Sequence, residues 1–371
     1  MNKGFSSILN ASRWIAALLV LVGHVRHLVF ADLKDVAQPN LIDKAFYFFT
    51  GLASEAVTIF FVVSGLLVGG LTLEKFRVGA SLGLKDYFIH RFSRIYIVYI
   101  PTLLIGVVIY HMVTYFQLSG EVSGHTDILT LLGNLAMLQN IIVDVFGNNH
   151  PLWSLAYEWW FYCIWAFAIG ILFYSGLTRY ISLFLLALLL VFLPNSIYLS
   201  LPVWLLGVAT FYYAGSNLPK PHPVFGVGVF LVVLVVSRLS HNVYNVVAQE
   251  PAYIQFARAS GLGVAYLLAL ASCYRLETPL WLDRLNEKLA SFSYSLYLIH
   301  YPLMFLVVAL VEKYLDIKSF QQPSLMAYLY FAVVSIILYL FSYLFSLITE
   351  KHTYKLIKLL RLIILKPSNK N

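Results

Sequence analysis

The chain is built from a succession of apolar runs, most of them long enough to cross a lipid bilayer as a helix. A helix needs about 20 predominantly apolar residues to span the hydrocarbon core, which is ~30 Å thick. Runs of this kind recur along the whole sequence and are separated by short polar segments. The sequence therefore predicts an all-α, polytopic integral membrane protein.

The composition excludes a soluble fold. Only 11% of the residues are charged and 60% are hydrophobic, and the mean hydropathy is +0.80. A soluble domain normally has about a quarter charged and roughly 45–50% apolar residues. A chain with so little charge cannot cover a water-exposed surface, and its 16% of aromatic residues suits the membrane–water boundary.

We predict about ten transmembrane helices and one further segment that does not cross. That segment, 127–143, is less apolar and carries Asn134, Gln139 and Asn140, which favours an interfacial or re-entrant position. The ten predicted spans are residues 12–31, 46–72, 95–116, 151–174, 179–194, 196–214, 223–239, 252–274, 291–311 and 325–348.

The distribution of basic residues predicts that both termini are cytoplasmic. The chain has 25 Lys and Arg residues and a formal net charge of +8. If the N-terminus is cytoplasmic and 127–143 does not cross, most of these residues lie on the inner side, as the positive-inside rule requires. If 127–143 crossed, the Lys-rich C-terminal segment would fall outside. The basic residues lie in short loops, so we expect no nucleic-acid partner.

The C-terminal segment alternates basic and apolar residues between Lys351 and Lys366. This pattern predicts an amphipathic helix that lies on the anionic inner leaflet. We therefore expect a transmembrane domain over residues 1–350 and a basic cytoplasmic tail over 351–371. No internal repeat and no second soluble domain is visible.

The sequence predicts no metal site and no disulfide framework. The two cysteines, Cys163 and Cys273, lie in separate apolar runs, where cysteine behaves as a small buried apolar residue. Neither a His-Glu-x-x-His helix nor a glycine-rich nucleotide loop of recognised spacing is present.

Ionisable residues at membrane depth are costly and are functional-site candidates by default. In the first span, Arg13 and His24 are eleven positions apart, which puts them on one helix face and about 16 Å apart along the axis. Arg13 is expected at the inner boundary and His24 at or beyond mid-membrane. A snorkelling arginine and a packed histidine are the structural alternatives, and we favour function for His24, which Arg26 and His27 follow.

The fourth predicted span opens with the sequence PLWSLAYEWWFY. Ser154 and Glu158 are one helical turn apart and share a face, and Glu158 is expected at a depth similar to that of His24. A buried carboxylate needs a partner or a proton. We therefore predict a His24–Glu158 pair in one membrane cavity, in which the carboxylate fixes the tautomer and the imidazole moves the proton. A structural hydrogen bond between helices is the alternative.

Two arginines mark the predicted start of the third span. Arg91 and Arg94 are three residues apart, so they share a helix face. A helix N-terminus with two arginines can bind phosphate. Anchoring of the span at the inner surface explains the same residues equally well.

Two further polar groups lie within predicted spans. In the ninth span, Tyr297 and His300 are three residues apart and either line a cavity or bond between helices. In the second span, Ser64 precedes Gly65, and small residues of this kind allow helices to approach closely.

Together these residues resemble the membrane-bound acyltransferase 3 family. In that family an Arg and a His separated by ten residues open the first span, as Arg13 and His24 do here. One departure is that the family's Arg-x-x-Arg-Ile pattern soon continues with Pro, which here arrives only at Pro101 and puts a local kink in doubt. The other matching motifs are, in family order, Phe60-Phe61-x-x-Ser64-Gly65, Arg91-x-x-Arg94-Ile95, Trp153-Ser154-Leu155-x-x-Glu158 and Tyr297-x-x-His300-x-Pro302.

The resemblance implies a function and a donor. Members of the family move an acyl group, commonly acetyl, from cytoplasmic acyl-CoA to a hydroxyl, often of a cell-envelope glycan such as O-antigen, capsule, exopolysaccharide or peptidoglycan. It therefore implies an O-acetyltransferase of the bacterial inner membrane, with acetyl-CoA as donor substrate, no tightly bound cofactor and a glycan or lipid-linked saccharide as acceptor. Arg91 and Arg94 would then hold the CoA phosphates and Arg13 would guide the thioester.

The same resemblance gives roles to the residues deeper in the membrane. His24, oriented by Glu158, would take the proton from the acceptor hydroxyl as it attacks the thioester, or would itself carry the acyl group transiently. Ser154, Trp153 or Tyr297 could stabilise the oxyanion.

Two other classes of protein compete with this interpretation. A transporter or flippase for a polar envelope precursor would also place His, Glu and Arg at membrane depth. Inverted repeats or paired broken helices would favour it, and the sequence has neither. A non-catalytic scaffold would not require the aligned face of Arg13 and His24.

Overall fold

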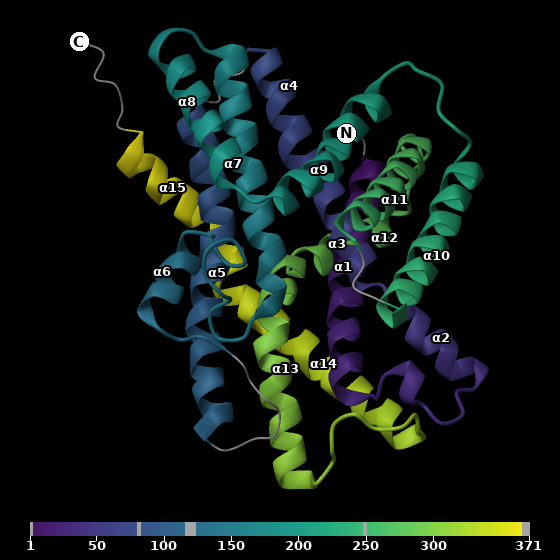
Figure 1. Ribbon diagram of the computed structural model, residues 1–371. Coiled ribbons are helices and arrows are strands. Elements are labelled where there is room, and N and C mark those ends of the chain that lie inside the picture. Colours follow the sequence, from purple (N-terminus) through teal and green to yellow (C-terminus); the bar gives the residue numbers. More distant parts are fainter. Residues whose placement is uncertain (1–2, 80–82, 116–123, 248–250, 366–371) are drawn as a thin grey trace.

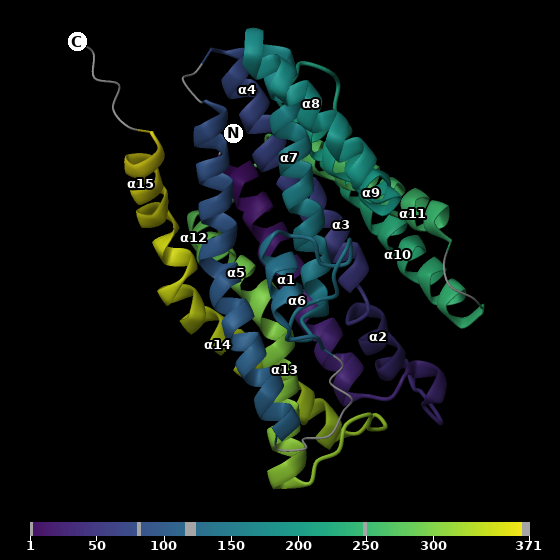
Figure 2. The same ribbon diagram turned by 60° about the vertical axis from the view of Figure 1, so that its left-hand side comes forward.

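The structure, a computed structural model, describes residues 3–79, 83–115, 124–247 and 251–365. These residues fold into a bundle of helices and form no β-sheet (Figures 1 and 2). Nine helical segments of this part of the chain are long and apolar enough to cross a membrane. The predicted all-α, polytopic membrane fold is therefore confirmed.

The predicted spans correspond closely to the observed helices. The fifth predicted span, 179–194, is α8 (Gly176–Phe192), which is apolar but has only 17 residues and is therefore not among those nine segments. The third begins earlier than predicted, because α5 starts at Leu84, and it continues through Pro101 without a break. Besides α8, the long helices are α1 (Lys3–Val29), α5 (Leu84–Tyr115), α7 (Trp153–Phe173), α9 (Asn195–Gly215), α10 (Pro223–Val247), α11 (Ala252–Ser272), α13 (Ser293–Leu315) and α14 (Leu325–Ile348).

The second span is interrupted. Its helical pieces are α2 (Leu41–Phe49), α3 (Ala53–Ser64), a π-helical turn over Gly65–Gly70 and α4 (Leu71–Arg77). π-helical turns within helices are frequent at functional sites, and this one begins directly after Ser64.

Glycines allow α3 and the π-helical turn to lie directly against α9. A Cβ atom at Gly65 would stand 1.8 Å from the carbonyl oxygen of Trp204, and one at Gly207 would stand 2.0 Å from that of Val62. Both approaches are to backbone atoms, which cannot move aside as a side chain can. The close helix approach predicted around Gly65 is therefore confirmed.

The segment 127–143 enters the bundle and returns. It contains the short helix α6 (Ile128–Leu135). The Tyr99 hydroxyl donates to the Asn134 carbonyl at 2.9 Å, and Tyr99 lies near the middle of α5. The ends of the segment meet again, because the Gly147 N–H donates to the His125 carbonyl at 3.0 Å. Of the two predicted positions, the structure supports the re-entrant one.

The buried side chain of Asn134 holds this re-entrant segment together. Its amide nitrogen donates to the carbonyls of Thr130 and Asp144, both at 2.8 Å. Its amide oxygen accepts from the Phe146 N–H at 3.1 Å. Irregular backbone at membrane depth needs partners of this kind, because no water is available to bond it.

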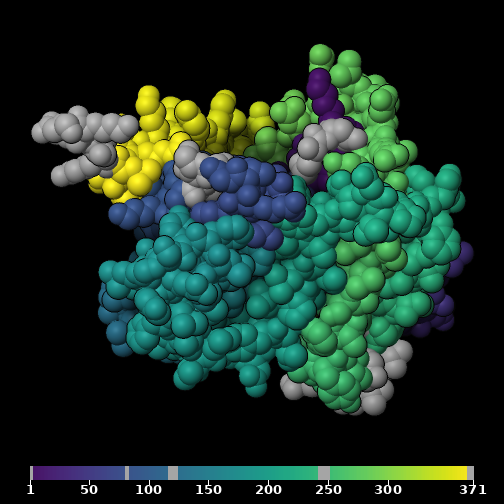
Figure 3. Space-filling view, turned by 90° about the horizontal axis from the view of Figure 1, so that it is seen from above, coloured from purple at the N-terminus to yellow at the C-terminus, as the bar shows by residue number. Residues whose placement is uncertain are grey.

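The two ends of the chain lie at one end of the bundle. α1 begins there and α15 (Thr353–Ile364) ends there, at the top of Figures 1 and 2. Figure 3 looks onto this end, where the start of α1 (purple), the α4–α5 region (blue) and the C-terminal helix (yellow) share one face. The arrangement agrees with an even number of crossings. That this face is cytoplasmic remains a prediction.

The predicted tail helix is present as α15 and packs along α5. The Arg361 guanidinium donates to both carboxylate oxygens of Asp86, at 2.6 and 2.8 Å. This bidentate pair ties the tail to the first turn of α5. Contact of the tail with the inner leaflet stays a prediction, and residues 366–371 lie outside the described residues. The remaining helix is α12 (Leu280–Ala290), and short 3-10 turns cover Leu33–Asp35, His150–Leu152 and Glu350–His352.

Candidate active site

A cavity of about 300 Å³ lies between α1, α3, α5, α7 and α13, and we call it the arginine cavity. It lies in the half of the bundle that is nearer to the chain ends, since Arg13 and Arg94 stand in the first halves of α1 and α5. Apolar residues of α3 complete its lining. The polar residues that line it are Arg13, Ser64, Arg91, Arg94, Ser154, Glu158, Tyr162, Ser293, Tyr294 and Tyr297.

A second cavity, of about 430 Å³, lies between α1, α3, α7, α9 and α11, and we call it the histidine cavity. Arg258 lines it and donates to the buried carboxylate of Glu55 at 3.2 Å. Sequence reasoning missed this ion pair, although a glutamate inside the second apolar run was a visible signal. The polar and aromatic residues lining the cavity include His24, His150, Trp153, Tyr157, Ser196, Gln255, Arg258 and Tyr297.

The two cavities share one wall. Val57, Phe61 and Tyr297 line both of them. The neighbouring residues Trp153 and Ser154 face opposite ways, Trp153 into the histidine cavity and Ser154 into the arginine cavity. The motif that begins at Trp153 therefore lies across the wall.

Hydroxyl groups occupy the wall between the cavities. The Tyr297 hydroxyl and Ser154 Oγ are 2.5 Å apart. Each also lies within reach of the Pro151 carbonyl oxygen, at 3.1 and 3.2 Å. One of the two hydroxyls donates to the other, and the second donates to the carbonyl. Either arrangement leaves the pair anchored to the backbone before α7.

Glu158 belongs to the arginine cavity. It accepts from the Tyr162 hydroxyl at 2.5 Å, and Ser64 Oγ lies 3.0 Å from that hydroxyl. Trp204 Nε1 donates to Ser64 at 3.2 Å. An ionised carboxylate only accepts, so the donors run in one direction, from Trp204 through Ser64 and Tyr162 to Glu158. The partly buried carboxylate thus has a partner on its own helix.

The predicted pair of His24 and Glu158 is wrong. The two side chains line different cavities, and no contact joins them within the described residues. The depth estimate placed both groups at a similar level, but it could not show toward which side of α7 the carboxylate points. Glu158 turns toward Tyr162 and the arginines, so it does not orient His24.

Arg91 and Arg94 both line the arginine cavity, as side chains on one helix face should. Their predicted position at a helix N-terminus is wrong, because α5 starts at Leu84 and both residues lie beyond its first turn. The helix end therefore adds nothing to an anion site here. Arg91 lies over the rings of Tyr87 and Tyr162, with 5.9 and 5.8 Å to the ring centroids.

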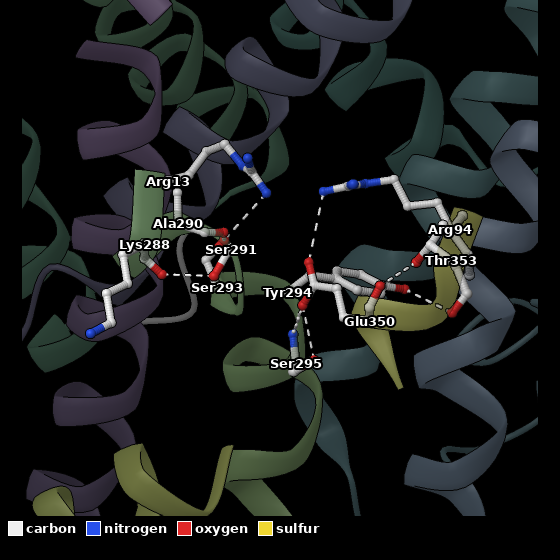
Figure 4. Close-up of polar contacts among 11 residues, drawn as sticks. Arg13, Arg94, Lys288, Ala290, Ser291, Ser293, Tyr294, Ser295, Glu350 and Thr353 are labelled. Carbon is white, nitrogen blue, oxygen red and sulfur yellow. Dashed lines mark hydrogen bonds and ion pairs between the residues drawn. The ribbon is translucent and has the colours of Figure 1, made fainter. Parts of the chain in front are cut away.

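Arg13 and Arg94 reach into the same space from opposite sides, as Figure 4 shows. Arg13 donates to Ser293 Oγ at 3.4 Å. Arg94 lies 4.0 Å from the carboxylate of Glu350. Three arginines thus face the cavity, against the carboxylate of Glu158 on its lining and that of Glu350 behind it. This balance favours an anionic ligand.

Glu350 is a site residue that sequence reasoning missed. Its side chain is only 8% exposed, and it accepts from the Ser295 N–H at 3.1 Å and from Ser295 Oγ at 2.9 Å (Figure 4). It thereby caps the first turn of α13 and holds Arg94. In the sequence it stands beside Lys351 at the head of the basic tail, where it looks like a surface residue.

His24 is held between two rings of α13. Its ring centroid lies 5.4 Å from that of His300 and 5.0 Å from that of Tyr301, the latter ring standing nearly perpendicular to it. His300 is fully buried and lines neither cavity. The predicted stripe of Tyr297 and His300 therefore divides, with the tyrosine in the wall and the histidine behind His24.

The described residues contain no group of three or more His, Cys, Asp or Glu side chains that could hold a metal ion. The predicted site residues thus fall into two sets around one wall. Arg13, Ser64, Arg91, Arg94, Ser154 and Glu158 lie on one side, His24 and Trp153 lie on the other, and Tyr297 faces both.

Comparison with known proteins agrees with this architecture. No curated protein and no solved structure is similar enough to this chain to give a match. A family model does match: the acyltransferase domain of acyltransferase family 3 covers residues 7–347, nearly the whole chain. That range contains every predicted site residue and both cavities, and the chain is a multi-pass membrane protein that belongs to acyltransferase family 3.

Proposed function

We propose that this membrane acyltransferase moves an acetyl group from acyl-CoA, bound on the side of the arginine cavity, to a hydroxyl group in the histidine cavity. The acceptor is a cell-envelope glycan or a lipid-linked sugar, and the membrane is the bacterial inner membrane. The observation that carries the proposal is the wall that the two cavities share at Tyr297. A charged thioester donor and a hydroxyl acceptor that approach from opposite sides would meet there.

The arginine cavity supplies the binding chemistry for the donor. Guanidinium groups bind phosphate in a charge-assisted, often bidentate way, and Arg91 and Arg94 present two of them on one face of α5. Arg13, bonded to Ser293, would guide the acyl thioester toward the wall. Glu158 and Glu350 keep the net positive charge of the empty cavity small, which limits the cost of holding three arginines at membrane depth.

The histidine cavity supplies the base. His24 would take the proton of the acceptor hydroxyl as its oxygen attacks the thioester carbonyl carbon. The C–S bond breaks, the new ester forms, and the CoA thiolate leaves and takes up the proton. The hydroxyls of Tyr297 and Ser154 lie where they could donate to the oxyanion as it forms. Transient acylation of His24 is the variant of this route that splits the transfer into two steps.

A transfer assay tests the proposal. Purified protein in proteoliposomes would receive [14C]acetyl-CoA together with the glycan and lipid fraction of envelope membranes, and the label in that fraction would be counted. We expect His24→Ala to lower the rate by about 10²–10⁴-fold, the usual contribution of a general base. His125→Ala is the control, because the His125 side chain is exposed and lines neither cavity.

The donor site is tested in the same preparation. The double variant Arg91→Ala with Arg94→Ala should raise the KM for acetyl-CoA at least tenfold, since it removes two charge-assisted contacts. Undiminished transfer in His24→Ala would remove that residue from the mechanism. Movement of an unmodified sugar across the bilayer without any transfer of label would favour the transporter class instead.

A further inference from the structure

The ring of His300 has one nitrogen bonded and one nitrogen buried without a partner. Nδ1 lies 3.0 Å from the Leu296 carbonyl oxygen, one turn earlier in α13. A carbonyl oxygen only accepts, so Nδ1 carries the hydrogen. In the neutral imidazole Nε2 then holds the lone pair. Nε2 is buried and accepts no hydrogen bond from any described residue.

A buried acceptor without a donor is unfavourable and calls for an explanation. The explanation that the geometry offers is His24. The two ring centroids are 5.4 Å apart, and the planes are tilted by only 30°. Two imidazoles joined by an N–H···N bond have their centroids at about this separation, since about 3 Å separates the nitrogens in such a bond and each nitrogen lies about 1 Å from its ring centre.

No carboxylate is placed to hold the ring of His24 in the way that His300 could. Within the described residues, no Asp or Glu side chain forms an ion pair or a hydrogen bond with His24. The charged and titratable groups around it are Arg26 and His27 on its own helix, His150 from the turn before α7, and His300 with Tyr301 on α13. Of these, His300 is the group whose free atom is a buried acceptor.

His24 and His300 are arranged as a catalytic base and the residue that holds it should be. His24 lines the histidine cavity, whereas His300 lies behind it and lines neither cavity. Tyr301 stands nearly perpendicular to the His24 ring, at 5.0 Å between centroids, and limits its rotation. A catalytic histidine acts well when a second group holds its other nitrogen and so selects its tautomer.

We propose that His300 is the positioning residue of His24. In this proposal one ring N–H of His24 turns to His300 Nε2, which has no partner among the described residues, and the lone pair of the other His24 nitrogen is then directed at the histidine cavity. The inference rests on the proposed function, because it gives that lone pair the acceptor hydroxyl as its target. The proton passes from the acceptor oxygen to His24, which then donates through both nitrogens, and it leaves with the CoA thiol. His300 keeps its own proton on Nδ1 throughout.

Three substitutions separate this role from a structural one. His300→Phe keeps a ring but has no acceptor. His300→Asn can still donate to the Leu296 carbonyl but does not reach the position of Nε2. His300→Gln can place an amide oxygen near that position, so it serves as the conservative variant. His125→Gln is the matched control at an exposed histidine.

Two readouts are needed. The first is acetyl transfer at several pH values, from which kcat and KM are obtained. We expect His300→Phe and His300→Asn to lower kcat by about 10²–10³-fold, within the range of general-base effects, with KM nearly unchanged. His300→Gln should recover most of kcat, and the pH dependence of the Phe and Asn variants should change as His24 loses its fixed tautomer.

The second readout does not depend on activity. The ring 15N chemical shifts of His24, in protein labelled at histidine and assigned by their loss in His24→Gln, report which nitrogen carries the hydrogen. We expect one tautomer in the native protein and in His300→Gln, and a mixture in His300→Phe and His300→Asn. If the His300→Phe protein does not fold, the His300→Asn protein is used for both readouts.

Unchanged tautomer and unchanged kcat in folded His300→Phe or His300→Asn would overturn the proposal. So would equal losses in the Asn and Gln variants, since a purely structural role would not distinguish them. A protein that transfers no acetyl group but whose His24 tautomer depends on His300 would overturn the proposed function and leave the histidine pair in place.

Discussion

The charged groups beside the arginine cavity are paired both within one helix and between distant parts of the chain. Glu158 finds Tyr162 on its own helix, and Arg94 finds Glu350, which comes from the far end of the chain. Both carboxylates stand beside the arginine cavity, where they reduce the cost of three arginines. The histidine cavity has its own pair in Glu55 and Arg258, and His24 remains free of any carboxylate among the described residues.

The role of Glu350 can be measured as stability. Glu350→Ala removes the acceptor of the Ser295 N–H and Oγ, and we expect it to lower the free energy of unfolding by about 2–3 kcal/mol, as for hydrogen bonds to a charged group. Glu350→Gln keeps an oxygen that can accept from Ser295, so we expect its free energy of unfolding to fall by about half as much. Both variants should lower the KM for acetyl-CoA, because the arginine cavity becomes more positive once the carboxylate beside Arg94 is gone.

Thermal unfolding in detergent micelles would give these differences. Glu287→Ala, at an exposed position on α12, is the control and should leave the unfolding temperature unchanged. A Glu350→Ala protein as stable as the native one would show that the carboxylate does not hold α13.

At the scale of single residues, the sequence indicated candidate side chains but not which of them meet. Arg13 and His24 could be assigned to one face of one helix, because helix geometry fixes that relation. The pairing of Glu158 with His24 was wrong, because spacing along one helix carries no information about the side on which another helix packs, whereas its actual partner Tyr162 stands four residues later on the same helix, a spacing that the sequence does show. Glu350 gave no signal, since a glutamate beside Lys351 is ordinary at a membrane surface.

At the scale of elements, glycines decide how closely α3 and α9 pack. Gly65 and Gly207 bring the two backbones together, and this contact fixes Ser64, which starts the π-helical turn and accepts from Trp204. Since Ser64 lines the arginine cavity, the shape of that cavity depends on the same contact.

A pair of substitutions tests this packing. Gly65→Ala would place a Cβ atom 1.8 Å from the Trp204 carbonyl oxygen, so α3 and α9 must separate, and we expect a loss of at least about 1–3 kcal/mol, as for overpacked cores. Gly261→Ala meets no atom within 4 Å and should be neutral or stabilising by up to about 1 kcal/mol, through helix propensity.

Thermal unfolding again supplies the measurement, with acetyl transfer as the second readout. Equal unfolding temperatures for the two alanine variants would contradict the proposed role of Gly65. A loss of transfer in Gly65→Ala alone would link the α3–α9 contact to the arginine cavity.

Elements were predicted more reliably than their ends. Ten apolar runs could be found because a bilayer demands length and low polarity. The start of α5 at Leu84 could not, because its first turns carry Lys85, Asp86 and Arg91 and read as a loop. In the structure α15 packs on these polar turns, and its Arg361 side chain donates to Asp86. The two residues are 275 positions apart, so no local sequence pattern predicts the contact.

At the scale of the whole molecule, the arginine cavity and the histidine cavity lie back to back within one bundle. The arginine cavity lies toward the end where α1 and α5 begin, and the histidine cavity lies beyond the shared wall. In the proposed function, this arrangement would let a donor and an acceptor from opposite sides of a membrane react without either one crossing. The basic loops and tail predict that the arginine side is cytoplasmic.

The most direct test of this account is the side from which the donor is used. Vesicles containing the protein in one orientation, fixed by protease access to a tag at the C-terminus, would receive [14C]acetyl-CoA either outside or inside. The account predicts label in the acceptor only when acetyl-CoA is on the side of the chain ends, with transfer abolished in His24→Ala. Transfer of equal rate from both sides, or only from the opposite side, would contradict it.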